Sequence, residues 1–318
     1  MVAIIEVTNK CNLRCKHCFI EKRGEDLSLP ALMQGISSMI NHFDDFRFVG
    51  GEPLMVPDRL EVLIKTVMSY GKQVNFTTNG LLVKKLKNKI RNWDLLNVCL
   101  SIDGFGDSHN IQRNHNGAFE QVKEAAFILS ELGIRVQVSF CLTKLNFRDI
   151  EKVYRLCEEF GAEFLRIQPL VPRKNMDEVL QLPPLVLRQT IEDCSKIHGS
   201  VKIMLPTSLC LLPGAQMCVA GKVLIYVCSD GVVMPCIYAH LQIGRIGVDN
   251  MDELIEKACF KEPAKGCKEC LDYLVCRGGC RGGALMFYND INAPDPNCLV
   301  AKTLGYTEKY IKQNSEFP

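Results

Sequence analysis

The sequence predicts an α/β protein in which helices cover a parallel sheet and a smaller cysteine-rich region follows. From residue 2 to about 200, runs rich in β-branched residues alternate with amphipathic stretches. Such alternation is typical of repeated strand–helix units that build a parallel sheet. Beyond about residue 205 it ends, and cysteine and glycine become frequent. We therefore expect two domains, residues 1–205 and residues 206–318.

Six strands are expected in the first domain. Their nearly continuous apolar character is typical of strands that are buried on both faces of a sheet. Periodicity does not decide whether this sheet closes into a barrel. The expected strands cover residues 2–8, 45–50, 73–78, 95–102, 134–142 and 163–170.

Helices are expected between these strands and after the last one. The stretch 117–132 shows the basis, because its apolar residues recur at three- and four-residue steps and form one face. In the second domain, "KVLIYVCSDGVVMPC" (222–236) predicts a β-hairpin that turns at Asp230-Gly231, and 251–259 predicts a short helix. The remaining expected helices cover residues 30–42, 58–70, 81–91, 147–160 and 184–198.

The composition is that of an ordinary globular protein, except for its cysteines. The 318 residues are 47% hydrophobic and carry a net charge of +2, so neither nucleic acid nor a membrane is an expected partner. The N-terminus lacks a signal peptide pattern, and the most apolar stretch (210–228) contains Pro213 and Lys222, which disfavours a membrane span. In a cytoplasmic protein, closely spaced thiols are more often metal ligands than disulfides. We expect a cytoplasmic protein in which part of the 17 cysteines bind metal.

The first cysteine group is "CNLRCKHCF", directly after the first strand. It places Cys11, Cys15 and Cys18 at the carboxyl end of that strand, where ligands gather in parallel α/β folds. A structural zinc site takes four protein ligands, and His17 is too closely flanked by its neighbours to be a natural fourth. Iron–sulfur cubanes ordinarily take four cysteines, so three thiolates suit a cluster with one iron open to a substrate or cofactor.

Three further loops complete a pattern that resembles the radical S-adenosylmethionine (radical SAM) enzymes. "GGEP" follows the second expected strand, "TTNG" (77–80) ends the third and "SIDG" (101–104) ends the fourth. Together with the three-cysteine loop, these are four loops at four successive strand ends, in the order that the family shows. The resemblance covers residues 1–200 and implies a partial (β/α)6 barrel, similar to part of a TIM barrel.

The resemblance also implies the chemistry. A [4Fe-4S] cluster held by the catalytic Cys11, Cys15 and Cys18 would bind S-adenosylmethionine and, once reduced, cleave it to a 5′-deoxyadenosyl radical that removes a hydrogen atom from a substrate. Glu52 is expected to accept from the cofactor's ammonium group, and His17 to pack against its adenine. The residues implied in cofactor binding are His17, Gly50, Gly51, Glu52, Pro53, Thr78, Asn79, Ser101 and Asp103.

The second cysteine group is Cys267, Cys270, Cys276 and Cys280, followed by Cys298 and preceded by Cys218 and Cys236. It resembles the SPASM extension of radical SAM enzymes, which houses two auxiliary [4Fe-4S] clusters and would bring the total to three. The first auxiliary cluster would be one ligand short, and we expect Cys228 to complete it, with Cys210 or an open iron as alternatives. A zinc ribbon built from the four clustered cysteines would leave three others unexplained. The resemblance assigns Cys218, Cys236 and Cys280 to the first auxiliary cluster, and Cys267, Cys270, Cys276 and Cys298 to the second.

Most SPASM relatives act on peptides or proteins, and a minority act on tetrapyrroles or small amino sugars. A peptide or protein substrate is therefore expected, as in the maturation of ribosomal peptides or of sulfatases. The alternative is a small-molecule oxidoreductase or decarboxylase of the haem-biosynthesis type. A non-catalytic cluster carrier is disfavoured, because it would need no S-adenosylmethionine loops.

The expected partners follow from this substrate class. Because the sequence begins at the first expected strand, we do not expect the leader-recognition domain of many peptide-modifying members. A separate leader-binding protein, a protein substrate that needs none, or a small molecule is therefore expected. An electron donor such as flavodoxin or ferredoxin is also implied. Cys141 is a candidate hydrogen-atom donor, with a buried structural thiol as the alternative. The polar candidates for facing the substrate are His109, Arg113, Arg166, Gln168 and Arg173.

Overall fold

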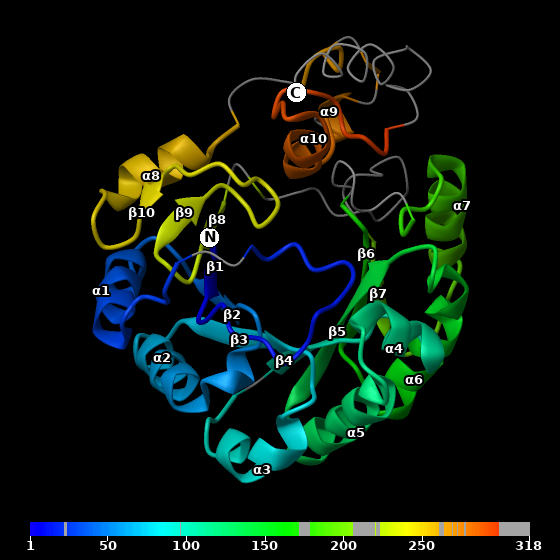
Figure 1. Cartoon of the computed structure of the whole chain (residues 1–318), viewed down its shortest axis with the longest axis horizontal. Coiled ribbons are helices and arrows are strands. Elements are labelled where there is room, and N and C mark those ends of the chain that lie inside the picture. Colours follow the sequence, from blue (N-terminus) through cyan, green and yellow to red (C-terminus); the bar gives the residue numbers. More distant parts are fainter. Residues whose placement is uncertain are drawn as a thin grey trace.

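The computed structural model describes residues 1–21, 24–95, 97–171, 179–205, 220, 223–260, 264–268, 270–271, 273–276 and 278–298. The described strands form one ten-stranded sheet in the order β10-β9-β8-β1-β2-β3-β4-β5-β6-β7. Neighbouring strands from β8 through β1 to β7 pair in parallel, whereas β9 and β10 pair antiparallel. The sheet curves into an arc with helices along its outer side (Figure 1). This confirms the predicted partial barrel.

The six predicted strands are all present. A further short strand, β7 (Lys202–Met204), extends the sheet beyond the prediction, and its three residues are too few to show a period. The predicted six are β1 (Val2–Glu6), β2 (Asp45–Val49), β3 (Gln73–Thr78), β4 (Asn97–Ser101), β5 (Arg135–Leu142) and β6 (Phe164–Pro169).

The predicted helices are also present, and among the described residues of the first domain one helix was missed. This is α4 (Asp107–Arg113), whose seven residues are mostly polar and show no apolar face. Two short 3₁₀ turns, η1 (Pro53–Met55) and η2 (Phe147–Asp149), precede α2 and α6. The predicted helices are α1 (Leu29–Met39), α2 (Pro57–Ser69), α3 (Val83–Arg91), α5 (Ala118–Glu131), α6 (Ile150–Glu159) and α7 (Pro184–Cys194).

The apolar core lies between the outer side of the sheet and the helices. In β5, Val136, Val138 and Phe140 are buried in this core, and the residues between them, Gln137 and Ser139, are only half buried. The apolar character of the strands had suggested burial on both faces of the sheet. This expectation is wrong for β5, which is fully buried on one face only. Because side chains alternate between the two faces of a strand, the half-buried residues of β5 lie on the inner side of the arc.

The C-terminal hairpin belongs to the same sheet. β8 (Leu224–Val227) and β9 (Val232–Met234) turn at Gly231, whose φ of +88° favours glycine, and this confirms the predicted hairpin. However, β8 also pairs in parallel with β1, with Val2 opposite Leu224. A short β10 (Gly244–Arg245) and the predicted helix α8 (Met251–Ala258) follow.

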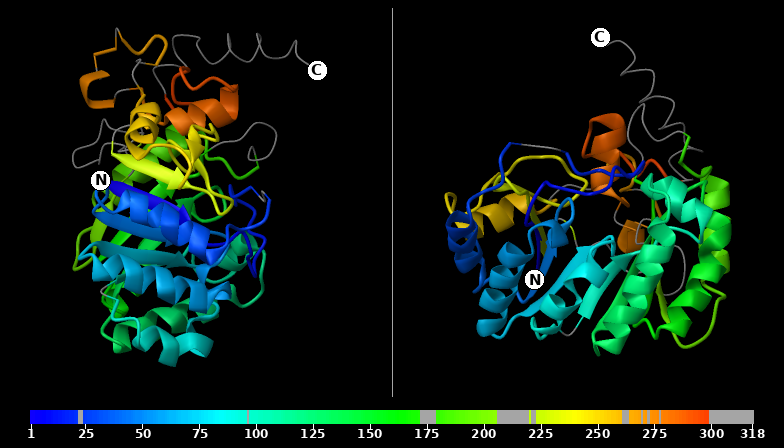
Figure 2. Two further views of the ribbon diagram at one scale, coloured as in Figure 1. Left: turned by 90° about the vertical axis from the view of Figure 1, so that its left-hand side faces the viewer. Right: turned by 60° about the horizontal axis from the view of Figure 1, so that its bottom comes forward.

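The cysteine-rich segment contains α9 (Tyr273–Cys276) and α10 (Arg281–Tyr288) and lies at the open side of the arc (Figures 1 and 2). A Cβ on Gly282 would lie 2.7 Å from Cβ of Tyr238, which follows β9. A Cβ on Gly283 would lie 3.4 Å from Cγ1 of Val171, just after β6. The segment therefore contacts chain from both sides of the opening.

Three of the predicted site residues cannot be compared with the structure. Cys210, Cys218 and Arg173 lie outside the described residues. None of the cysteines that the structure describes forms a disulfide. Among the described helices, none has both the length and the apolar character to cross a membrane.

Candidate active site

The loops after β1 and β2 lie directly against each other. The backbone N–H of Gly51 donates to the carbonyl of Thr8 at 2.8 Å, and that of Glu52 donates to the carbonyl of Lys10 at 2.8 Å. A Cβ on Gly51 would lie only 2.2 Å from the Lys10 carbonyl oxygen. At Gly50, whose φ is +148°, a Cβ would lie 2.4 Å from the Thr8 carbonyl oxygen. The two glycines therefore let the "GGEP" loop approach the main chain immediately before Cys11.

The Glu52 carboxylate is held by the loops after β2 and β3. It is 1% exposed and accepts hydrogen bonds from Leu54 N (3.0 Å), Thr78 Oγ1 (2.7 Å) and Asn79 N (2.8 Å). Burial raises its pKa, although these three donors act in the opposite direction. Pro53 opens the 3₁₀ turn that directs the Leu54 N–H back to this carboxylate.

Asn79 links the loop after β3 to the cysteine loop. Its Nδ2 donates to Oδ1 of Asn12 at 2.8 Å, and its Oδ1 accepts from Leu81 N at 3.1 Å. Ser101, at the end of β4, is half buried and stands opposite Ser139 in the parallel register. The predicted residues of these loops therefore meet at one end of the sheet.

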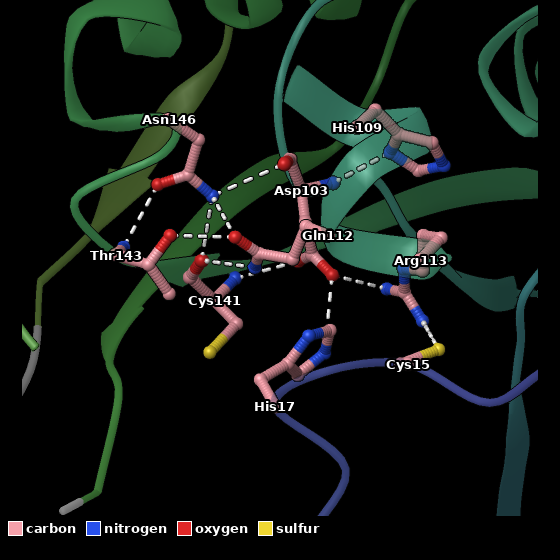
Figure 3. A network of polar contacts seen from close by, with 9 residues as sticks. All are labelled: Cys15, His17, Asp103, His109, Gln112, Arg113, Cys141, Thr143 and Asn146. Carbon is pink, nitrogen blue, oxygen red and sulfur yellow. Dashed lines mark hydrogen bonds and ion pairs between the residues drawn. The ribbon is translucent and has the colours of Figure 1, made fainter. Parts of the chain in front are cut away.

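Asp103 is at the centre of a buried polar network (Figure 3). Its Oδ2 lies 2.6 Å from Arg113 Nη2 and 3.3 Å from His17 Nε2, and its Oδ1 accepts from Cys141 N at 2.7 Å. Burial alone would raise the pKa of Asp103, but the charges of Arg113 and His17 and the Cys141 donor outweigh it and hold the pKa below its usual value. Both oxygens of the Asp103 carboxylate therefore contact groups of the protein itself.

His109 supports the loop after β4. Its Nδ1 accepts from the backbone N–H of Asp103 at 3.0 Å, and the side chain is 1% exposed. Burial, and then the charge of Arg113, lower its pKa to about 3, so the imidazole is neutral and its proton is on Nε2. His109 is therefore buried, and the expectation that it faces a substrate is wrong.

The remaining part of the network fixes the main chain of Cys141 at the end of β5. Its carbonyl accepts from Gln112 Nε2 at 2.9 Å and from Asn146 Nδ2 at 2.8 Å. Thr143 Oγ1 in turn donates to Gln112 Oε1 at 2.6 Å. Sequence reasoning missed Gln112, Thr143 and Asn146 as site residues. One signal was present, because residues 109, 112 and 113 are spaced to share one helix face.

The three thiols of the cysteine loop lie close enough to influence one another. Burial, and then the charges of Glu52, Cys15 and Cys18, raise the pKa of Cys11 to about 11, against a lowering effect of Leu13 N, which donates to its sulfur at 3.4 Å. Burial also raises the pKa of Cys15, and Arg113 opposes this rise from a distance of 3.8 Å between Nη1 and Sγ.

Comparison with known proteins agrees with this geometry. The family model of the radical SAM superfamily matches residues 5–157, which include the three cysteines and the loops after β2, β3 and β4. The chain belongs to the radical SAM superfamily. The family expected from the sequence is thereby confirmed, and the protein is a radical SAM enzyme.

Two curated relatives illustrate the range of this radical SAM enzyme's neighbours. The AdoMet-dependent heme synthase of Oleidesulfovibrio alaskensis is 26% identical over 335 residues, which covers 92% of this chain and 85% of that protein. The mycofactocin maturase MftC of Mycobacterium tuberculosis is 26% identical over 340 residues, which covers 98% of this chain and 85% of that protein.

A solved structure shares the fold over the full length. anSMEcpe with bound AdoMet superimposes with a TM-score of 0.75 at 21% identity and covers 100% of both chains. The same protein with bound AdoMet and Cp18Cys peptide has a TM-score of 0.72 at 22% identity and covers 98% of both chains. The agreement extends to the region after residue 206, in which this radical SAM enzyme carries its second cysteine group.

Three of those C-terminal thiols lie close enough to a fourth, Cys267, to influence its pKa. Burial, and then the charges of Cys298, Cys276 and Cys270, raise the pKa of Cys267 to about 11. These are the four cysteines expected to share one cluster. In the part of the chain that the structure describes, no three His, Cys, Asp or Glu side chains converge closely enough to hold a single metal ion.

The other expected C-terminal cluster ligands that the structure describes are Cys228, Cys236 and Cys280. Cys236 Sγ accepts from Ala239 N at 3.1 Å, and Cys280 Sγ accepts from Gly283 N at 3.2 Å at the start of α10. Burial is the main cause of the raised pKa of Tyr238, and the charges of both thiols add to the rise. Cys228 is buried in an apolar cluster with side chains of the β8–β9 hairpin. Its role as a cluster ligand stays a prediction.

Proposed function

We propose that this radical SAM enzyme cleaves S-adenosylmethionine reductively and uses the resulting radical to remove a hydrogen atom from a peptide or protein. Cys11, Cys15 and Cys18 would hold the [4Fe-4S] cluster. When bound, the cluster and S-adenosylmethionine supply a 5′-deoxyadenosyl radical. The observation that carries this proposal is the meeting of the three-cysteine loop with the "GGEP" and "TTNG" loops through direct hydrogen bonds.

The donor set suits a cluster at this position. The other two thiols of the loop lie close enough to Cys11 for their charges to add to the rise of its pKa that burial causes. Thiolates are the ligands that iron–sulfur clusters take. Nε of Arg113 is buried and has no acceptor among the described residues. A buried donor without an acceptor costs free energy, so a bound group that accepts from it would stabilise the site.

The roles of the cofactor-binding residues follow from their contacts. Glu52 would bind the ammonium group of the cofactor with a carboxylate whose orientation Thr78 and Asn79 already determine. Gly50, Gly51 and Pro53 would shape the same loop, and Ser101 would reach the cofactor from the end of β4. Asp103 would act through its two partners, because it orients the ring of His17 and the guanidinium of Arg113.

The C-terminal region would hold two auxiliary [4Fe-4S] clusters in a SPASM domain. One cluster would be bound by Cys267, Cys270, Cys276 and Cys298. In support, burial and then the charges of the last three thiols raise the pKa of Cys267. Cys236 and Cys280, with Cys218 and Cys228, would bind the other. Clusters of this kind and free thiols both require a reducing compartment, so we place the enzyme in the cytoplasm.

A peptide or protein substrate is favoured by the relatives that cover the whole chain. MftC is named as a maturase, and anSMEcpe has been solved with a bound peptide on the same fold. A leader-binding protein and a one-electron donor such as flavodoxin or ferredoxin would then be the partners. A tetrapyrrole is the second candidate substrate, because the heme synthases match 92% of the chain at a similar identity.

Iron content tests the cluster assignment. After anaerobic reconstitution, the chain should bind about twelve irons, four for each of three clusters. Replacing Cys11, Cys15 and Cys18 together by Ala should remove about four irons and abolish 5′-deoxyadenosine formation. A triple variant that keeps its full iron content would contradict the assignment of the loop.

A substrate test separates the two candidates. We expect peptides encoded beside the gene to stimulate 5′-deoxyadenosine formation and to change in mass. Iron coproporphyrin III should leave this rate unchanged and should show no shift of its Soret band on titration with the enzyme. The reverse result would favour the tetrapyrrole reaction. The triple cysteine variant serves as the inactive control for both substrates.

A further inference from the structure

We propose that Arg113 raises the reduction potential of the cluster at Cys11, Cys15 and Cys18 by donating from its guanidinium to the Cys15 sulfur, and that Asp103 moderates this effect. The inference rests on the proposed function, because it requires a cluster at these thiols. It makes Arg113 a positioning residue that acts through a ligand of the cluster.

The guanidinium is placed from two sides (Figure 3). Arg113 is the last residue of α4 and is 8% exposed, with Nη1 3.8 Å from Cys15 Sγ and Nη2 2.6 Å from Asp103 Oδ2. The cysteine loop is tied to the same helix end, because the N–H of Lys16 donates to the carbonyl of Gln112 at 3.0 Å. Helix and loop therefore hold donor and acceptor at a set separation.

The thiols of the loop differ in their surroundings. Cys11 Sγ accepts from the neutral backbone N–H of Leu13 at 3.4 Å, whereas Cys15 Sγ accepts from a cation. Hydrogen bonds from charged donors are about twice as strong as neutral ones. The Cys15 corner of a cluster would therefore carry the larger electrostatic effect.

Arg113 remains charged in this environment. A guanidinium is not deprotonated in proteins, and the Arg113 side chain is paired with the Asp103 carboxylate at 2.6 Å. Its planar fork can serve two acceptors at once, which a lysine cannot do in the same way. Asp103 is anchored independently by Cys141 N at 2.7 Å, so the ion pair does not rely on Arg113 alone for its position.

The sign of the effect follows from charge. Reduction adds one electron to the cluster, and N–H donors and positive charge near its sulfurs stabilise that reduced state. Arg113 should therefore make the potential less negative. Asp103 brings a negative charge beside the same guanidinium and should act in the opposite direction. A purely structural role would not give two residues of one ion pair opposite effects.

The experiment is a redox titration of the reconstituted full-length chain, monitored by electron paramagnetic resonance. The relevant signal is the one lost in the triple Cys11, Cys15 and Cys18 variant. Arg113→Gln should shift its midpoint to a more negative potential, and Arg113→Lys should do so by less. Asp103→Asn should shift it to a less negative potential. Arg91→Gln, which removes an exposed arginine at the end of α3, should leave it unchanged.

The outcomes separate this inference from the proposed function. Full iron content with an unchanged midpoint in Arg113→Gln would overturn the inference and leave the cluster assignment intact. Shifts of the same sign in Arg113→Gln and Asp103→Asn would also overturn it, since they would report general loosening. If Arg113→Gln does not retain iron, Arg113→Lys and Asp103→Asn decide by the signs stated above. A triple cysteine variant without iron loss would refute the proposed function itself.

Discussion

The N-terminal cysteine loop and the C-terminal cysteine segment both carry grouped thiols, but they are supported in different ways. The first stands on a sheet whose core includes the fully buried Phe46, Phe48 and Phe76. The second has, among its described residues, an apolar cluster of Ala284, Tyr288 and Ala293 with Phe287 beside it. Burial of large apolar side chains is the main source of folding free energy, so the barrel can hold its loop without a cluster. Among its described residues, the C-terminal segment has no apolar core of comparable size.

Polar contacts make up much of what holds the C-terminal segment. Asp295 accepts from Cys280 N at 2.7 Å and from Asn297 N at 2.8 Å. Lys265 and Asp290 form an ion pair at 2.7 Å that is partly exposed, and such pairs contribute little net free energy. Where the apolar core is small, metal binding commonly supplies the folding free energy. The proposed clusters would therefore be structural here and catalytic in the N-terminal loop.

The largest expected effect follows from removing a C-terminal cluster. Replacing Cys270 and Cys276 by Ala should bring the local opening free energy across 264–298 to about zero, whereas β3 and β4 should stay protected. Hydrogen exchange followed by mass spectrometry would show fast amide exchange across 264–298 and slow amide exchange in β3 and β4.

Cys259→Ala is the matched control, because this cysteine after α8 is not an expected ligand. It should leave exchange across 264–298 unchanged. Retained protection in the double variant would mean that the segment folds without its cluster. If the double variant keeps the iron of the barrel, it should still release 5′-deoxyadenosine slowly but form no product.

The next effect concerns the core of the barrel. Leu100→Ala, at a fully buried position of β4, should lower the free energy of unfolding by about 2–5 kcal/mol because it leaves a cavity. Leu271→Ala, at a position 99% exposed in the C-terminal segment, should change it by no more than about 0.5 kcal/mol. Urea unfolding followed by circular dichroism measures both. Equal losses would remove the contrast between the two regions.

The smallest effect is a pH dependence located in the barrel. The pKa of His109 falls from 6.5 to about 3 on folding, so the unfolded chain binds a proton that the folded chain does not. Stability should therefore fall as the pH falls below 6.5, by about 1 kcal/mol between about pH 7.5 and about pH 5.5.

His109→Asn keeps an acceptor for the Asp103 N–H and should remove this part of the dependence. His198→Asn, at an exposed position after α7, should not. Urea midpoints measured across this pH range compare the two variants. An unchanged slope in His109→Asn would show that the histidine takes up a proton in the folded state.

Much of the architecture is determined locally and could be predicted from the sequence. Strands and helices follow from apolar periodicity, and every predicted strand of the first domain is present. The motif loops were found because each directly follows a strand, and parallel strands bring their carboxyl ends to one edge. The spacing of Cys267, Cys270 and Cys276 likewise predicted a group of thiols, and the charges of Cys270 and Cys276 contribute to the raised pKa of Cys267.

Only the tertiary structure decided the long-range pairings. Cys15 and Arg113 are 98 residues apart, and Glu6 and Ser229 are 223 apart, yet each pair is in hydrogen-bonding contact. Periodicity reports which side of an element is buried but not which distant element covers it. The pairing of β8 with β1, and the role of the polar helix α4, therefore became visible only in the folded chain. Local patterns specify elements, whereas their partners depend on packing between distant parts of the chain.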